Sequence, residues 1–149
     1  MRFPLRAVGA GAATLLLLAV SADAAPTRHM INRVNVLEPL IAGGTEPFWD
    51  IVLTGRTLTW SDPETENRTG WVGAPRLSHG KAVWKGEATG VGPFTMTITR
   101  GPCEDGMSEY IYPLTVRVKA SDWDLRGCAA TVAAIERRDR EGREDGELR

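Results

Sequence analysis

Phe94-Thr95-Met96-Thr97-Ile98-Thr99-Arg100 alternates apolar and polar side chains without a break. Successive residues of an extended chain point to opposite faces, so Phe94, Met96 and Ile98 share one face and the three threonines share the other. A period of two is typical of a strand with one buried face and one exposed face. This stretch therefore predicts a β-strand, and the same period of two elsewhere in the chain predicts further strands.

The same alternation recurs in short stretches on either side of this strand. We expect further strands at residues 48–53, 57–60, 71–72, 81–84, 112–118 and 123–125, and a polar loop over 61–70. Gly, Pro, Asn and Asp cluster between these stretches, and the region from 34 to 126 carries no helical stripe of apolar residues. The sequence therefore predicts an all-β domain, a small antiparallel barrel or sandwich of roughly six to eight short strands.

Residues 1–24 have the three parts of a secretory signal peptide. Arg2 and Arg6 precede an apolar run from Ala7 to Val20, and Ala22-Asp23-Ala24 supplies the small residues of a cleavage site before Ala25. The apolar run is shorter than the roughly 20 residues that a membrane span needs. We therefore expect a mature chain that is periplasmic or secreted, with no stable membrane insertion after cleavage.

Three further segments follow the predicted signal peptide. Residues 25–34 are expected to form a flexible leader, 35–135 the β domain, and 136–149 a flexible charged tail or a frayed helix. The last segment is dominated by Arg, Asp and Glu, so it buries too little apolar surface to offset the entropy of ordering. The short apolar segment 129–135 fits either a strand end or a helical turn.

Charge and composition exclude several classes of protein. The 149-residue chain has a formal net charge of −1, whereas a general nucleic-acid binder needs a concentrated positive field. A four-ligand zinc site would need both Cys and both His residues of the chain. The sequence has no Gly-rich phosphate loop, no Gly-x-Ser-x-Gly elbow and no His-Glu-x-x-His motif. We therefore expect no catalytic residues, no metal, no cofactor and no nucleic-acid partner.

Cys103 and Cys128 both lie in the mature chain. Export makes a disulfide between them the expected state, and the chain-entropy model gives such a bridge roughly 3.5 kcal/mol. A redox-active pair would instead favour a Cys-x-x-Cys spacing, which is absent. The alternation along this strand leaves one question about the direction of the Cys128 side chain. If Trp123 and Leu125 face inward, Cys128 faces outward unless Gly127 sits in a bulge.

Gly43-Gly44-Thr45-Glu46-Pro47-Phe48-Trp49 places a carboxylate directly before two large aromatic residues. A carboxylate that is partly removed from water needs a cation or several hydrogen-bond donors. Glu46 therefore has two possible roles. It pins the strand entry by pairing with Arg100, Arg126 or backbone N–H groups, or it orients a ligand beside Phe48 and Trp49.

A second cluster runs from Cys103 to Pro113. Asp105-Gly106 is a strong turn signal between the two clearest strands. The carboxylates of Glu104, Asp105 and Glu109 suggest a calcium site, but their spacing does not fit an EF-hand loop, so solvated loop charges are the simpler expectation. Met107 and Tyr112 are expected to line a pocket or to close the barrel end.

The motifs Gly44-Thr45-Glu46-Pro47-Phe48-Trp49, Cys103-x-Asp105-Gly106-Met107-Ser108, Tyr112-Pro113 and Leu125-x-Gly127-Cys128-Ala129 resemble those of a family of small, uncharacterised bacterial envelope proteins. The likeness covers residues 42–129. Some members look like neighbours or fusion partners of domains similar to lysozyme inhibitors and heat-shock lipoproteins. The resemblance implies a periplasmic domain with a paired Cys103 and Cys128 and implies no activity. Lipid-anchored members carry an acylated Cys, which is missing after the apolar run here.

The leading expectation is a non-catalytic binding domain for a small ligand or an envelope protein. The candidate binding residues are Glu46, Phe48, Trp49, Asp105, Met107 and Tyr112. An alternative is an inhibitor-like interaction module that acts through the loop 104–109, and a third is a hydrolase with Glu46 or Asp105 as general base. A pocket lined by Trp49, Trp60 and Trp84 would favour a small ligand, and a rigid protruding loop would favour the interaction module.

Overall fold

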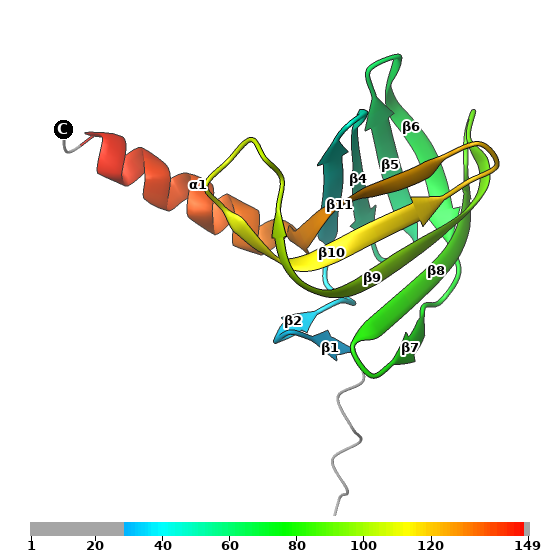
Figure 1. The fold of residues 1–149 in the computed structure, drawn as a ribbon, viewed down its shortest axis with the longest axis horizontal. Coiled ribbons are helices and arrows are strands. Elements are labelled where there is room, and N and C mark those ends of the chain that lie inside the picture. The colour runs from blue at the N-terminus through cyan, green and yellow to red at the C-terminus, as the bar shows by residue number, and fades with distance from the viewer. Residues whose placement is uncertain (1–28, 148–149) are drawn as a thin grey trace, which may run out of the picture.

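The computed structural model describes residues 29–147, which form a closed antiparallel β-barrel with one projecting helix (Figure 1). The barrel strands are β3 (Leu40–Thr45), β4 (Phe48–Thr54), β5 (Thr57–Asp62), β6 (Thr65–Val72), β8 (Lys81–Ala88), β9 (Gly92–Glu104), β10 (Ile111–Lys119) and β11 (Asp124–Thr131). Their order is β6-β5-β4-β3-β11-β10-β9-β8, and pairing of β6 with β8 closes the ring. β7 (Arg76–Ser78) pairs with β8 beside this closure. The predicted all-β barrel is confirmed.

The alternating stretches form strands as predicted. Phe94, Met96 and Ile98 are buried along β9, and Trp49, Ile51 and Leu53 are buried along β4. The expected loop over 61–70 is wrong except at residues 63–64, because 61–62 belong to β5 and 65–70 belong to β6. This segment is polar, so its strand is set by long-range pairing with β5 and β8 rather than by a local pattern.

The barrel interior is the hydrophobic core. Trp60 is 0% exposed and Trp84 is 2% exposed. The Trp60 ring lies 5.6 Å from the Phe94 ring and 5.5 Å from the Trp123 ring, centroid to centroid. Small barrels are normally filled by side chains in this way, which leaves the outer surface and the barrel ends to interact with other molecules.

The segment expected to be a flexible leader is partly structured. β1 (Met30–Ile31) pairs with β2 (Val34–Asn35), and both Ile31 and Val36 are 1% exposed within the core. Burial of these two apolar side chains stabilises the segment from Met30 onward, so this part of the expected flexible leader is structured. The predicted signal peptide and residues 25–28 lie outside the described residues.

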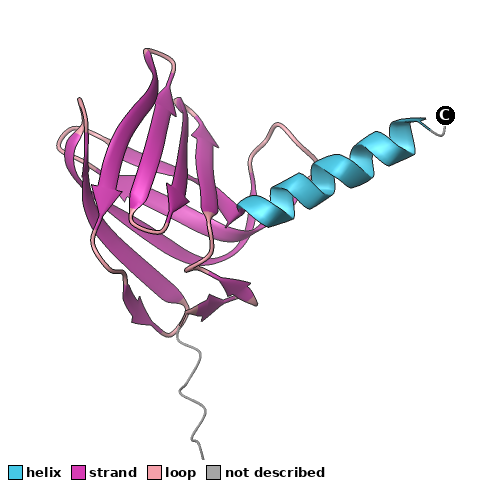
Figure 2. Cartoon of the chain, turned by 180° about the vertical axis from the view of Figure 1, so that it is seen from behind, coloured by secondary structure: helices cyan, strands magenta, loops and turns pink. Residues whose placement is uncertain are grey.

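β11 continues directly into α1 (Val132–Glu147), which points away from the barrel (Figure 2). The Thr131 hydroxyl accepts a hydrogen bond from the Ala134 N–H at 3.2 Å, which caps the helix start. The apolar segment 129–135 is therefore both a strand end and a first helical turn. Of the two alternatives expected for the charged segment, a flexible tail and a frayed helix, residues 136–147 form the helix. Within residues 29–147, no helix is long and apolar enough to cross a bilayer.

The Cys103–Cys128 disulfide is present, with a Cα–Cα distance of 5.5 Å. The pairing of β10 with β11 is unbroken from Lys119–Asp124 to Leu114–Ala129, so Gly127 sits in no bulge and Cys128 faces outward. The irregularity lies instead between β9 and β10, where the register shifts between Tyr112 and Leu114. Such a bulge redirects the end of a strand.

Candidate functional site

Most of the predicted site residues line a single pocket of about 260 Å³ at one end of the barrel wall, here called the outer pocket. It lies between the β3–β4 hairpin, the β9–β10 loop (residues 105–110) and the first turn of α1. Its lining residues are Ile41, Ala42, Gly43, Gly44, Thr45, Phe48, Trp49, Asp50, Asp105, Met107, Tyr112, Cys128 and Ile135. Five of the six predicted binding residues are in this set, and Glu46 is the exception.

The register of the strands places the pocket on the outer face of the wall. Gly43 pairs with Cys128 on one side and with Asp50 on the other, so these three residues form a row across β11, β3 and β4. This row faces outward, because the neighbouring Ala42 and Trp49 belong to the buried core. The outer pocket is therefore separate from the filled barrel interior.

Two adjacent glycines of β3, on opposite faces of the strand, belong to the pocket lining. A Cβ at Gly44 would lie 2.6 Å from Trp49 Nε1 and 2.4 Å from the Arg126 carbonyl oxygen, so only glycine allows this close packing. Gly43 adds no side chain to the outward row and leaves space beside Asp50. The hairpin then turns at Glu46-Pro47, a cis peptide, and brings Phe48 to the pocket rim.

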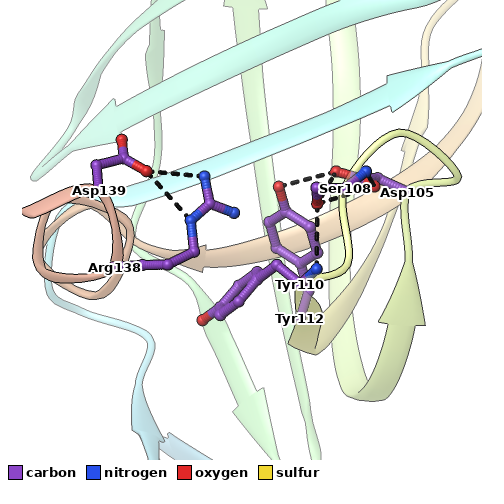
Figure 3. Close-up of polar contacts among 6 residues, drawn as sticks. All are labelled: Asp105, Ser108, Tyr110, Tyr112, Arg138 and Asp139. Atoms are coloured by element: carbon purple, nitrogen blue, oxygen red, sulfur yellow. Dashed lines mark hydrogen bonds and ion pairs between the residues drawn. The ribbon is translucent and has the colours of Figure 1, made fainter. Parts of the chain in front are cut away.

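Asp105 organises the β9–β10 loop. Its Oδ1 accepts a hydrogen bond from the Met107 N–H at 2.9 Å. Figure 3 shows the contacts with Ser108 and Tyr112: Oδ1 also accepts a hydrogen bond from the Ser108 N–H at 2.9 Å, and Oδ2 accepts one from the Tyr112 hydroxyl at 3.1 Å. These bonds, led by those from the two backbone N–H groups, lower the pKa of Asp105 to about 2. The loop is thus fixed from within, and Met107 stays 65% exposed at its tip.

Asp105→Asn is expected to lower the free energy of unfolding at pH 7 by about 1–2 kcal/mol, because it weakens the hydrogen bonds to an ionised carboxylate. The folded-state pKa of about 2 lies below the ordinary value of 3.8, so ionised Asp105 stabilises the fold above about pH 4. That contribution is lost as the pH falls through 2. Urea denaturation at pH 7 and at pH 2 measures the difference between wild type and variant, with Asp122→Asn as the control.

Equal stability of wild type and Asp105→Asn at pH 7 would show that these hydrogen bonds do not organise the loop. A stability difference that persists at pH 2 would contradict the assigned role of the ionised carboxylate.

Aromatic rings connect this loop to α1. The Tyr110 and Tyr112 rings meet edge to face with centroids 4.7 Å apart, and the Arg138 guanidinium lies 4.9 Å from the Tyr110 centroid. Arg138 also pairs with Asp139 at 2.9 Å (Figure 3). Burial raises the pKa of the Tyr112 hydroxyl, and its hydrogen bond to Asp105 adds to the shift. Arg138 is a contact that sequence reasoning missed, because its segment has no apolar pattern.

Glu46 has neither the pairing expected of it nor a place in the outer pocket. It is exposed at the hairpin turn, and no ion pair joins it to Arg100, Arg126 or any other residue in the described part of the chain. The expectation that Glu46 pins the strand entry through one of these arginines is therefore wrong. Its neighbours Phe48 and Trp49 reach the pocket because they lie beyond the turn.

Asp50 is the carboxylate that sequence reasoning overlooked. It lies on the outward row beside Gly43 and borders both the outer pocket and a shallower hollow with Ser61, Asp62 and Pro63. Burial raises the pKa of its carboxyl above 3.8, and no hydrogen bond from a described residue offsets that burial. The sequence feature that could have identified Asp50 is its position as the single polar residue in the apolar stretch 48–53.

Asp50→Asn is expected to raise the free energy of unfolding at pH 7 slightly, by up to about 0.5 kcal/mol. The raised pKa means that the ionised form is less favourable in the folded chain than in the unfolded chain. Wild type should therefore gain stability relative to the variant as the pH falls through that raised pKa. Urea denaturation at pH 7 and pH 4 measures this gain, and a variant less stable than wild type at pH 7 would contradict it.

Glu46 and Asp105, the two residues considered above as a general base, are poorly suited to that role. With a pKa of about 2, Asp105 has little affinity for a proton at neutral pH, so it is a weak general base. Glu46 stands apart from the pocket. Among the described residues, no three His, Cys, Asp or Glu side chains gather closely enough to hold a metal ion.

Comparison of the chain with protein-family models, with curated proteins and with solved structures finds no match. The resemblance drawn from the motifs therefore remains a prediction, and the geometry of the outer pocket carries the functional argument.

Proposed function

We propose that the mature chain is a non-catalytic binding domain in the periplasm or the secreted fraction, and that the outer pocket is its binding surface. The observation that carries this proposal is the meeting of three distant chain segments around one pocket with exposed apolar side chains. Phe48 is 54% exposed and Met107 is 65% exposed, and both line the pocket. Clustered exposed apolar groups are typical of surfaces that bind other molecules.

Two features favour this pocket over the barrel interior. The interior is occupied by large side chains such as Trp60 and Trp84, both almost fully buried. The pocket wall, in contrast, is held in place before any ligand arrives: the disulfide anchors Cys103, and Asp105 fixes the loop. A preformed site binds with a smaller loss of conformational entropy.

The proposed location rests on the disulfide and on the predicted signal peptide. Disulfides persist in oxidising compartments. Intact mass spectrometry of protein from its native host should find a chain that begins at Ala25 and is two hydrogens lighter than the reduced sequence. Free thiols together with residues 1–24 would contradict export.

A fragment screen followed by thermal shift tests the binding surface. Fragments that bind wild type are expected to bind Phe48→Ala and Met107→Ala about tenfold more weakly, a loss typical of removing one apolar contact from a binding pocket. Trp71→Ala and Ile111→Ala are matched controls, because these side chains are 55% and 59% exposed and do not line the outer pocket. Fragments that bind all four variants as tightly as wild type would overturn the proposal.

An interaction module that acts through the loop 104–109 is the second candidate, supported by the exposed Met107 on an internally fixed loop. A partner protein would cover more of the loop than a small ligand does. Glu109→Arg, outside the outer pocket, should then weaken partner binding while leaving fragment binding unchanged.

A further inference from the structure

Of the two carboxylates that line the outer pocket, Asp50 is the one without a hydrogen-bond or ion-pair partner among the described residues. Asp105 accepts hydrogen bonds from Met107, Ser108 and Tyr112, and Asp62 on the other side pairs with Arg68 at 3.0 Å. No ion pair or hydrogen bond from a described residue reaches the carboxylate of Asp50, although it is half-buried. A half-buried carboxylate without a partner is costly, and a cation beside it would recover part of that cost.

All charged side chains in the lining of the outer pocket are negative. Asp50 and Asp105 both contribute to it, and none of the described lining residues is Lys, Arg or His. Arg138 does not line the pocket, but its guanidinium, which pairs with Asp139 and lies against the Tyr110 ring, also approaches the hydroxyl of the lining residue Tyr112 (Figure 3). On the Asp50 side of the pocket, the lining carboxylates therefore favour a positively charged group.

The remaining lining suits the apolar part of such a ligand. Phe48 and Tyr112 supply aromatic groups, and Met107 and Ile135 supply flexible and branched apolar groups. Aromatic faces attract organic cations, and this attraction adds to that of a nearby carboxylate. The volume of about 260 Å³ is smaller than a typical drug-sized site, so it suits a compact group.

We infer that the outer pocket binds a small organic amine in its cationic form, with the ammonium group against Asp50 and the apolar body between Phe48 and Met107. This inference rests on the proposed function, because it names the ligand class of the same surface. It goes further by assigning the recognition of charge to Asp50, which the sequence patterns did not single out.

A nuclear magnetic resonance titration of the ¹⁵N-labelled protein tests the inference with three probes of similar shape. 2-Phenylethylamine is cationic at pH 7, 2-phenylethanol is neutral and 3-phenylpropionate is anionic. The amine is expected to shift the amide signals of residues 43–50 and 105–112, and to bind at least about tenfold more tightly than the other two probes. Asp50→Asn should weaken amine binding about tenfold, whereas Asp122→Asn, at the exposed β10–β11 turn, should not.

The outcomes separate this inference from the proposed function. If the neutral probe binds as well as the amine, or if Asp50→Asn binds the amine as tightly as wild type, the recognition of a cation is wrong while the pocket still binds. If no probe shifts the pocket signals, both fail. If a lysine-containing tripeptide binds more tightly than the amine, the proposal of a free amine is wrong, and the ligand is a lysine side chain of a partner protein.

Discussion

Replacing both Cys103 and Cys128 with alanine is expected to lower the free energy of unfolding by about 3.5 kcal/mol. The two residues are 25 positions apart, and a crosslink that closes a loop of this length removes many conformations from the unfolded chain. Cys128 is 3% exposed, and alanine fits the space it leaves, so the expected loss comes mainly from the missing crosslink. For a small domain this is a large share of the total stability.

Urea denaturation with and without a reducing agent measures this effect. Reduction should bring wild type down to the stability of the Cys103→Ala/Cys128→Ala variant and should leave the variant unchanged. A variant as stable as oxidised wild type would show that the disulfide does not hold this fold together. The same variant should also exchange the amide hydrogens of residues 103–112 faster, because the loop of the outer pocket loses its anchor.

Trp60→Ala is expected to cost about 3–5 kcal/mol, the range measured when a large buried aromatic side chain is truncated. Trp60 is 0% exposed and contacts the rings of Trp49, Phe94 and Trp123, so its removal leaves a cavity at the centre of the barrel. Chemical denaturation measures the loss.

Two further variants make the Trp60 test specific. Trp71→Ala removes a side chain of the same type that is 55% exposed, and it should change stability by no more than about 0.5 kcal/mol. Trp60→Phe should cost less than Trp60→Ala, since it keeps a ring in the core and removes an indole N–H that has no hydrogen-bond partner among residues 29–147. Equal losses for Trp60→Ala and Trp71→Ala would contradict a filled interior.

The sequence predicts the barrel where one face of a strand is buried and the other is not. Phe94, Met96 and Ile98 carry that signal, and so do Leu58 and Trp60 on β5. β6 lacks it, because its pairing with β5 and β8 depends on strands that lie elsewhere in the sequence. The helix after Thr131 begins with a local cap, a signal that the charged composition of the segment obscured.

The candidate site was predicted in part for a simple reason. Phe48, Trp49, Asp105 and Met107 belong to short motifs beside turns, and the fold brings those two turns to the same end of the barrel. The expected pairing of Glu46 with an arginine was wrong because such a pair depends on how distant strands are placed, which the local motif does not show. Asp50 and Ile135 reach the pocket through strand register and through the start of α1, which composition and spacing do not reveal.

The central claim is that ligands bind in the outer pocket and not inside the barrel, and the methionines test it most directly. Met107 lines the outer pocket, Met96 is 1% exposed inside the barrel, and Met30 lies in the β1–β2 hairpin. In a protein labelled with ¹³C at the methionine methyl groups, addition of 2-phenylethylamine is predicted to shift the Met107 signal and to leave those of Met96 and Met30 in place. A shift of the Met96 signal with Met107 unchanged would contradict the account.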